Sequence, residues 1–139
     1  MIVLDTNVLS ALVRERPDPK VVAWLDAQPP TSIWTNAVTV LEIRYGLHIL
    51  PSGKRRSALM QAFALLLVET LAGRIAPFDT PAAEEAAKLM ARRHALGRPG
   101  DLRDTMIAGI VMASHAQLAT RNASRFGDLP VPVIDPWLA

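Results

Sequence analysis

The stretch Ile2-Val3-Leu4-Asp5-Thr6-Asn7 near the start of the chain decides the fold class. Ile2 to Leu4 is short, fully apolar and rich in β-branched residues, which is typical of a strand buried on both faces of a parallel sheet. Polar residues follow at once, and in parallel α/β sheets the ligand crevice lies at the carboxyl ends of the strands. The sequence therefore predicts a strand buried on both faces that delivers Asp5 to a functional site.

Beyond this stretch, short apolar runs alternate with longer segments of helical periodicity. We expect strands or extended segments at residues 2–4, 32–34, 74–78, 118–120 and 131–134. Helices are expected at residues 6–14, 19–28, 54–71 and 102–117, with two more that begin near Thr35 or Asn36 and at Thr80. Thr6 or Asn7 is expected to cap the first helix. This order predicts one domain over residues 1–139, an α/β fold built as a three-layer α/β/α sandwich around a central, mainly parallel sheet.

The composition excludes several classes of function. The chain has no cysteine, so disulfides, thiolate nucleophiles and zinc–thiolate sites are excluded. His48, His94 and His115 lack metal-ligand spacing, which disfavours a zinc hydrolase. We see no signal peptide and no apolar run long enough to cross a membrane, and we therefore expect a cytoplasmic protein. A net charge of +2 is weak evidence for nucleic-acid binding, which would depend on local basic groups: Lys54-Arg55-Arg56, Arg92-Arg93, and Arg121 with Arg125.

Four carboxylates lie in or beside apolar and helical sequence: Asp5, Glu42, Asp101 and Asp104. Burial of a carboxylate without a partner is costly, and several carboxylates brought together repel one another unless cations neutralise them. Asp101 and Asp104 are one helical turn apart and so lie on one face. The joint pattern favours a pocket that collects acids because it holds a hard divalent metal ion.

Each acid also has a purely structural interpretation. Asp101 or Asp104 could cap a helix, and Glu42 could pair with Arg44 or another nearby base. Asp5 is harder to explain in this way, because Thr6 and Asn7 can cap the helix that follows it. Two further acids, Asp128 and Asp135, adjoin Gly127 and Pro136 and are assigned to turns outside the site.

Longer motifs make the pattern specific. They resemble the motif set of PIN-domain ribonucleases: Asp5-Thr6-Asn7 after a strand, Glu42 in a helix, Asp104-x-x-Ile107-Ala108 and Thr120-Arg121-Asn122. Spacing and flanking sequence are most similar to the FitB-like branch of the VapC toxins, including Glu42-Ile43-Arg44-Tyr45-Gly46-Leu47 and the closing Pro136-Trp137. The resemblance covers essentially the whole chain and implies a PIN-like sandwich.

The resemblance implies a Mg²⁺- or Mn²⁺-dependent endoribonuclease, the toxin of a type II toxin–antitoxin pair. Asp5, Glu42 and Asp104 match the family's catalytic acids. We expect Asp5 and Asp104 to bind the metal directly, and Glu42 to bind it through water or to orient the attacking water. Supporting roles fall to Thr6, Asn7, Asp101, Thr120 and Asn122, and the candidates for binding substrate are Arg14, Arg44 and Arg121.

One position departs from the family's pattern. Many relatives carry a fourth acid where this chain has Asn122. A neutral amide attracts a second cation less strongly than a carboxylate does. We therefore expect one well-occupied metal site rather than two, with Asp101 as a candidate substitute acid.

The resemblance also implies three partners besides RNA. They are a small cognate antitoxin that lies across the nuclease, a second copy in a homodimer, and operator DNA bound through the antitoxin. Several apolar residues exceed the apparent need of a thin sheet, and they either line such an interface or belong to the core: Val8, Leu9, Leu12, Leu59, Phe63 and Leu66.

Rival functions follow from the same residues. A catalytically weak or inactive PIN module could act in a DNA-bound regulatory complex with its antitoxin, and Asn122 favours this alternative. A phosphatase of the haloacid-dehalogenase type needs an aspartate where Asn7 stands, and a P-loop enzyme needs a Gly-x-x-x-x-Gly-Lys-Ser/Thr run that the chain lacks. A DNA-specific nuclease is a further alternative, because a metal site recognises phosphate rather than sugar.

Overall fold

The computed structural model describes all residues from Met1 to Ala139. Five parallel strands form one sheet in the order β3-β2-β1-β4-β5. In chain order the strands are β1 (Ile2–Leu4), β2 (Ile33–Asn36), β3 (Ile75–Ala76), β4 (Gln117–Ala119) and β5 (Val133–Ile134). Val3 of β1 is in register with Trp34 of β2 on one side and with Leu118 of β4 on the other. The first strand is therefore the central one, and it is buried on both faces as its sequence predicts.

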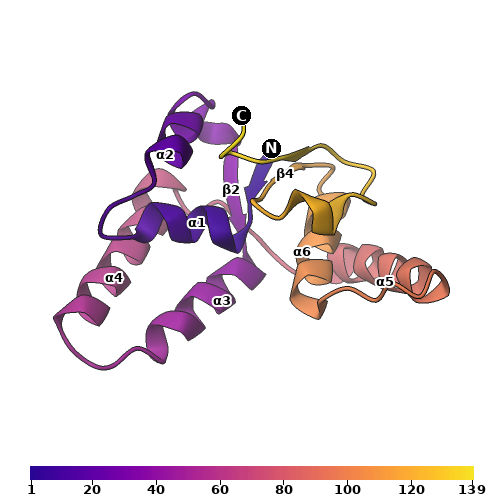
Figure 1. Cartoon of the computed structure of the whole chain (residues 1–139), viewed down its shortest axis with the longest axis horizontal. Helices are drawn as coiled ribbons and strands as arrows, with labels where there is room; N and C mark the ends of the chain where they lie inside the picture. The colour runs from indigo at the N-terminus through magenta and orange to yellow at the C-terminus, as the bar shows by residue number, and fades with distance from the viewer.

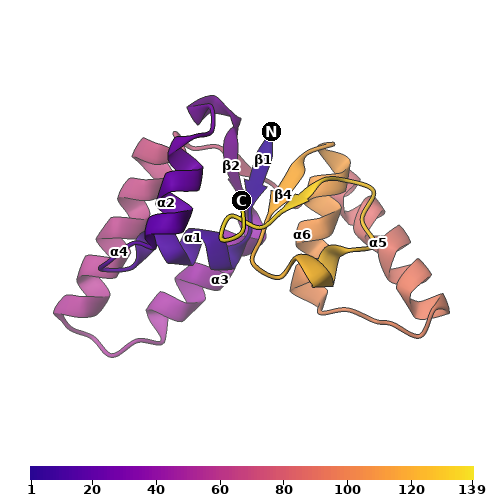
Figure 2. The ribbon, with the colours of Figure 1, turned by 45° about the horizontal axis from the view of Figure 1, so that its top comes forward.

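Helices cover both faces of this sheet (Figures 1 and 2). One group consists of α1 (Thr6–Val13), α2 (Pro19–Asp26), α3 (Ala37–His48) and α4 (Lys54–Leu65), and the other of α5 (Thr80–Ala95) and α6 (Leu102–Ala113). Three short helical turns complete the chain: η1 (Pro30–Ser32), the π-helical η2 (Leu66–Thr70) and η3 (Ala123–Phe126). The predicted three-layer α/β/α sandwich is confirmed. No helix has the length and apolarity that a membrane span requires.

The central strand separates two apolar cores. Ile2 and Leu4 pack with the residues of α1 to α4, whereas Val3 packs with those of α5 and α6. Successive residues of a strand point to opposite faces of the sheet, and helices cover both faces. All three side chains are therefore buried. Among the apolar residues whose role was open, Val8, Leu9 and Phe63 are fully buried core residues. The other three are half-buried against the same core: Leu12, Leu59 and Leu66.

Close packing of α5 against α6 fixes the position of Asp104. Gly109 of α6 lies so near α5 that a Cβ atom there would be only 2.4 Å from the carbonyl oxygen of Ala82 and 2.8 Å from Cβ of Ala86. Only glycine tolerates this approach. The first turn of α6, which carries Asp104, is thus held by a tightly packed helix pair.

The structure corrects several element boundaries. The predicted helix 102–117 ends at Ala113, because His115 adopts a left-handed φ of 52° and Gln117 joins β4 opposite Ile2. The prediction that Thr6 or Asn7 caps α1 is wrong, since Asp5 is the N-cap. Asn36 rather than Thr35 caps α3. The last strand is shorter than predicted, covering Val133–Ile134 only.

Candidate active site

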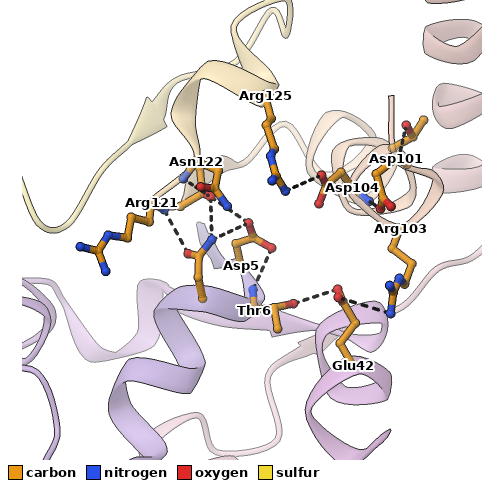
Figure 3. A network of polar contacts seen from close by, with 12 residues as sticks. Asp5, Thr6, Glu42, Asp101, Arg103, Asp104, Arg121, Asn122 and Arg125 are labelled. Carbon is orange, nitrogen blue, oxygen red and sulfur yellow. Dashed lines mark hydrogen bonds and ion pairs between the residues drawn. The ribbon is translucent and has the colours of Figure 1, made fainter. Parts of the chain in front are cut away.

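Polar side chains gather where the three middle strands end. Asp5 directly follows β1, Asn36 ends β2 and Thr120 directly follows β4. Because the strands are parallel and in register, these residues meet at one edge of the sheet. α3 and α6 then bring Glu42 and Asp104 to the same edge, and Figure 3 shows Asp5, Glu42 and Asp104 around a common space. The structure thus brings together the three acids that the sequence singles out.

Asp5 is buried and held by three donors. Its Oδ1 accepts a hydrogen bond from the backbone N–H of Thr6 at 2.7 Å, and its Oδ2 accepts from the hydroxyl of Thr120 at 2.8 Å and from Nδ2 of Asn7 at 3.5 Å. Burial raises the pKa of Asp5 above its usual value, and the charges of Asp104 and Glu42 add to this rise. The hydrogen bonds from Thr120 and Thr6 lower this pKa and offset part of the rise. Asp5 therefore caps α1. It also places in the site a carboxylate whose negative charge is disfavoured by burial.

Glu42 is tied to the strand ends through a chain of hydroxyl groups. Its Oε1 accepts from the hydroxyl of Thr6 at 2.9 Å, and that hydroxyl lies 3.1 Å from the hydroxyl of Thr39. Nδ2 of Asn36 donates to the Thr39 hydroxyl at 3.0 Å and to the carbonyl of Leu4 at 3.3 Å. This chain fixes the carboxylate of Glu42 relative to β1. Glu42 does not pair with Arg44, the structural alternative considered above, but with Arg103, at 3.7 Å between Oε2 and Nη1.

Asp104 and Asp101 have different roles at the start of α6. Asp101 is exposed and caps the helix, its Oδ1 accepting from the backbone N–H of Asp104 at 3.1 Å. Asp104 turns toward Asp5, and its Oδ2 lies 3.4 Å from Nη1 of Arg125. Burial raises the pKa of Asp104 and the charge of Asp101 adds to the rise, while Arg125 and Arg103 oppose it. Asp101 thus fits the capping interpretation, and Asp104 is the member of the pair that faces the other acids.

Two supporting residues, Thr120 and Asn7, each bind both Asp5 and the loop after β4. The hydroxyl of Thr120 is buried, donates to Asp5, and accepts from the backbone N–H of Asn122 at 3.1 Å. Asn7 accepts from the backbone N–H of Arg121 at 3.0 Å through its Oδ1. These bonds connect the start of α1 with the loop that follows β4, so the orientation of Asp5 depends on both segments.

The arginines named as candidates for binding substrate lie apart from the acids or only at the edge of the site. The guanidinium of Arg44 stacks over Phe63 at 4.8 Å, and that of Arg121 stacks over Trp137 at 4.7 Å, pointing away from Asp104 (Figure 3). Arg14 is exposed at the end of α1 and lines a groove that also contains Thr6 and Glu42. Of the three, Arg14 is the one that shares a hollow with a catalytic candidate.

Two arginines that the sequence analysis did not single out for substrate contact the acids directly. Arg103 pairs with Glu42, and Arg125 reaches from η3 to pair with Asp104 (Figure 3). Arg103 adjoins Asp104 in the sequence, and Arg125 belongs to a local basic group with Arg121. These signals do not say which acid each arginine reaches, because both pairs span elements distant in the chain.

The donor set fits a loosely held Mg²⁺ or Mn²⁺ rather than a tightly caged ion. No group of three His, Asp or Glu side chains is arranged to hold a metal ion between them. Mg²⁺, however, commonly binds one or two carboxylates and keeps several of its waters. Asp5 and Asp104 supply carboxylate oxygens, and burial raises the pKa of both, with neighbouring negative charges adding to the rise. A cation beside them would stabilise the charged carboxylates, so the residues present fit the group.

Comparisons with known proteins agree with this geometry. The model of the PIN domain family matches residues 2–130. VapC ribonuclease Y4jK of Sinorhizobium fredii is 40% identical over 137 residues, which cover 99% of this chain and 98% of the relative. Toxin FitB of Neisseria gonorrhoeae is 35% identical over 137 residues, covering 99% of each. The crystal structure of FitAcB from Neisseria gonorrhoeae superposes with a TM-score of 0.90 at 34% identity, over the full length of both chains.

Fold and site together define a class of protein, a parallel α/β sandwich with three acids at one edge of its sheet. The chain belongs to the PIN domain family and, within it, to the VapC toxins. The family resemblance that the sequence motifs indicate is thereby confirmed over the full length of the chain.

Proposed function

We propose that this protein is a divalent-metal-dependent endoribonuclease that acts as the toxin of a toxin–antitoxin pair. The observation that carries the proposal is the convergence of Asp5, Glu42 and Asp104 from β1, α3 and α6 on one polar edge of the sheet. The names of its relatives, a VapC ribonuclease and a toxin, support RNA as the substrate. An enzyme with this substrate would work in the cytoplasm.

Each acid has a distinct role in this proposal. Asp5 and Asp104 would hold Mg²⁺ or Mn²⁺, which when bound would supply Lewis acidity to the scissile phosphate and to a water. Glu42, fixed by the hydroxyl of Thr6, would orient the attacking water or accept its proton. Thr6 and Thr120 would keep the carboxylates in place. With Asn122 in place of an acid, we propose a single well-occupied metal position.

Cleavage of a labelled, mixed-sequence RNA in Mg²⁺, Mn²⁺ or EDTA tests this function. We expect cutting in both metals and none in EDTA. An Asp5→Asn preparation, purified in parallel, controls for contaminating ribonuclease, and a DNA strand of the same sequence shows whether the sugar matters. Cutting that persists in EDTA, or that is equally strong with Asp5→Asn, would contradict the proposal. Folded protein that cuts no RNA would favour the non-catalytic regulatory module.

A groove beside the site supports an antitoxin as the partner. It lies between α1, α3 and α4, has a volume of about 1170 Å³ and runs from Thr6 and Glu42 to Leu59. Apolar residues make up much of its lining, and exposed basic residues accompany them: Arg14, Arg16, Lys54 and Arg55. We propose that an antitoxin segment with apolar and acidic residues fills this groove and so covers Glu42. Operator DNA would then be bound through the antitoxin.

A second surface supports the homodimer. Leu41 and Tyr45 of α3 and its C-cap residue Ile49 follow one another at helical spacing, and they are 59%, 59% and 65% exposed. An exposed apolar stripe of this kind is typical of an interface. We propose that it joins two copies of the chain.

Co-expression of the chain with small proteins encoded beside its gene provides the samples. These samples test both the antitoxin and the dimer. Ala58→Glu places a bulky charge in the groove, and Ala64→Glu is its matched control on the same helix outside the groove. We expect Ala58→Glu to weaken antitoxin binding by about tenfold or more, because the charge would be desolvated against apolar side chains. We expect Ala64→Glu to leave antitoxin binding unchanged.

Light scattering should show two copies of the 15.1 kDa chain per complex. Equal antitoxin binding by Ala58→Glu and Ala64→Glu would contradict the groove as the antitoxin site. A single copy of the chain per complex would contradict the homodimer.

A further inference from the structure

A second hollow, of about 710 Å³, adjoins the acids on the side opposite the groove. It lies between the end of α5, the loop of residues 97–101, the start of α6 and η3. Three arginines, Arg93, Arg98 and Arg125, line it, and Leu96 is its only apolar lining residue. Asp104 belongs both to this hollow and to the acid cluster, so the two are continuous.

The ion pairs within the hollow leave one arginine without a partner. Asp128 uses both oxygens to bind Arg93, at 2.9 Å to Nε and 2.9 Å to Nη2. Asp101 accepts from the backbone at the start of α6. Arg125 reaches Asp104, whereas the guanidinium of Arg98 makes no hydrogen bond or ion pair. The hollow therefore presents the free positive charge of Arg98 and the loosely held charge of Arg125.

Arg93 makes the wall of the hollow rigid. Its side chain is only 8% exposed, and besides Asp128 it binds the hydroxyl of Thr105 at 3.1 Å and the backbone carbonyl of Arg125 at 3.4 Å. Gly100 makes room for it, since a Cβ atom there would be 2.7 Å from Nη1 of Arg93. The turn that carries Arg125 is thus bonded to the guanidinium of Arg93 through the carbonyl of Arg125. The loop that carries Arg98 packs against that guanidinium at Gly100, and the backbone N–H of Arg98 donates to the backbone carbonyl of Arg93 at 2.8 Å.

Arg125 can exchange the carboxylate of Asp104 for another anion. Its distance of 3.4 Å to Asp104 exceeds the 2.7–2.9 Å or so of a strong charge-assisted hydrogen bond. Its side chain is also 61% exposed, so the pair contributes little to stability. A cation that took Asp104 as a ligand would release the guanidinium toward the hollow.

We propose that Arg98 and Arg125 form a subsite for the RNA backbone, which binds the phosphate group next to the one that is cut. The proposal rests on the ribonuclease function proposed above. Guanidinium groups suit phosphate oxygens because they donate in a planar fork. A hollow with one apolar side chain offers no anchor for a peptide, and its continuity with Asp104 places it along the path of a strand held at the acids. Neither arginine is among the three substrate-binding candidates taken from the sequence.

Binding of a labelled, mixed-sequence single-stranded RNA in EDTA tests the subsite without cleavage. We expect the double variant Arg98→Ala/Arg125→Ala to bind RNA about tenfold more weakly and to show a salt slope smaller by about one. The backbone contacts of both residues with Arg93 survive these changes. Lys20→Ala/Lys88→Ala, at exposed positions of α2 and α5 outside both hollows, removes the same two charges and should change the affinity less than about twofold. Arg98→Lys/Arg125→Lys should recover only part of the affinity, because an ammonium group keeps the charge but lacks the planar fork of donors.

The outcomes separate this subsite from the ribonuclease function. If wild-type protein cuts and binds RNA and the double alanine variant binds it equally well, the subsite is wrong and the nuclease stands. An equal loss with Lys20→Ala/Lys88→Ala would show only a general effect of charge and would also overturn the subsite. If wild-type protein neither cuts nor binds RNA, the ribonuclease function fails, and the subsite fails with it.

Discussion

Replacement of Asp104 by asparagine is expected to reduce metal-dependent RNA cleavage by about 100-fold or more while making the metal-free protein more stable. The loss of activity follows because a metal ligand supplies several kcal/mol of transition-state stabilisation, and about 2.7 kcal/mol corresponds to a factor of 100. The gain in stability follows from the electrostatics of the site. Activity and stability thus oppose each other at this residue.

The gain in stability has a defined sign. Burial raises the pKa of Asp104 in the folded protein, and the charge of Asp101 adds to the rise. An acid whose pKa is higher folded than unfolded costs stability once the pH exceeds both values, and this cost disappears as the pH falls toward the unfolded value. Asparagine carries no charge and removes the cost at neutral pH. The exposed pair with Arg125, which is lost, contributes little.

Thermal unfolding in EDTA and in Mn²⁺ measures both effects. In EDTA, Asp104→Asn should melt above the wild type. Added Mn²⁺ should raise the melting temperature of the wild type, because a ligand that binds only the folded state stabilises it, and should raise that of the variant much less. Glu84→Gln removes an exposed acid from α5 and should behave as the wild type in both assays. A variant that melts lower in EDTA, or that retains cleavage, would contradict this account of Asp104.

Replacement of Asp128 by alanine is expected to lower the free energy of unfolding by about 2–4 kcal/mol. The bidentate bonds from Arg93 to Asp128 neutralise a guanidinium that is only 8% exposed. Without Asp128 this charge stays buried and has only the hydroxyl of Thr105 and the carbonyl of Arg125 as partners. Because Asp128 itself is 49% exposed, water can enter its place, and we expect a loss below that of a fully buried pair.

The effect should depend on pH in a specific direction. The hydrogen bond from Arg93 holds the pKa of Asp128 below its usual value. The stability that the pair contributes is therefore present above the unfolded pKa of about 3.9 and is lost as the pH falls through the lower, folded pKa. Wild-type protein should lose this contribution on acidification, whereas Asp128→Ala should already lack it at neutral pH.

Urea unfolding of a double-mutant cycle checks the pair. The single variants Asp128→Ala and Arg93→Met and the double variant should show that the two losses are not additive, with the double variant more stable than their sum predicts. Asp26→Ala, an exposed acid at the end of α2, controls for the loss of a negative charge. Additive losses, or an equal loss in Asp26→Ala, would show that the contact does not stabilise the protein. The Asp128→Ala variant should also make η3, and with it Arg125, more mobile.

The amino-acid sequence by itself determined the fold class and the identity of the acids. Three apolar residues before Asp5 predict a strand buried on both faces, and this strand lies at the centre of a parallel sheet. Alternating strands and helices suffice for the layered architecture because local periodicity reports which face of each element is buried. Glu42 and Asp104 stand out for the same local reason, since each is a charge within or beside apolar helical sequence.

The tertiary structure alone decided the partners of these acids. Sequence analysis assigned Asp128 to a turn, yet it binds Arg93 from 35 residues away, and Arg125 reaches Asp104 across 21 residues. It gave Asp5 no capping role, because the choice between Asp5, Thr6 and Asn7 depends on where β1 ends against β4. Ion pairs and caps of this kind depend on the order of strands and the packing of helices, which bring side chains together at distances of a few ångströms. Local sequence patterns carry no record of those distances, and they therefore indicate which residues are chemically suited to a site but not what each of them contacts there.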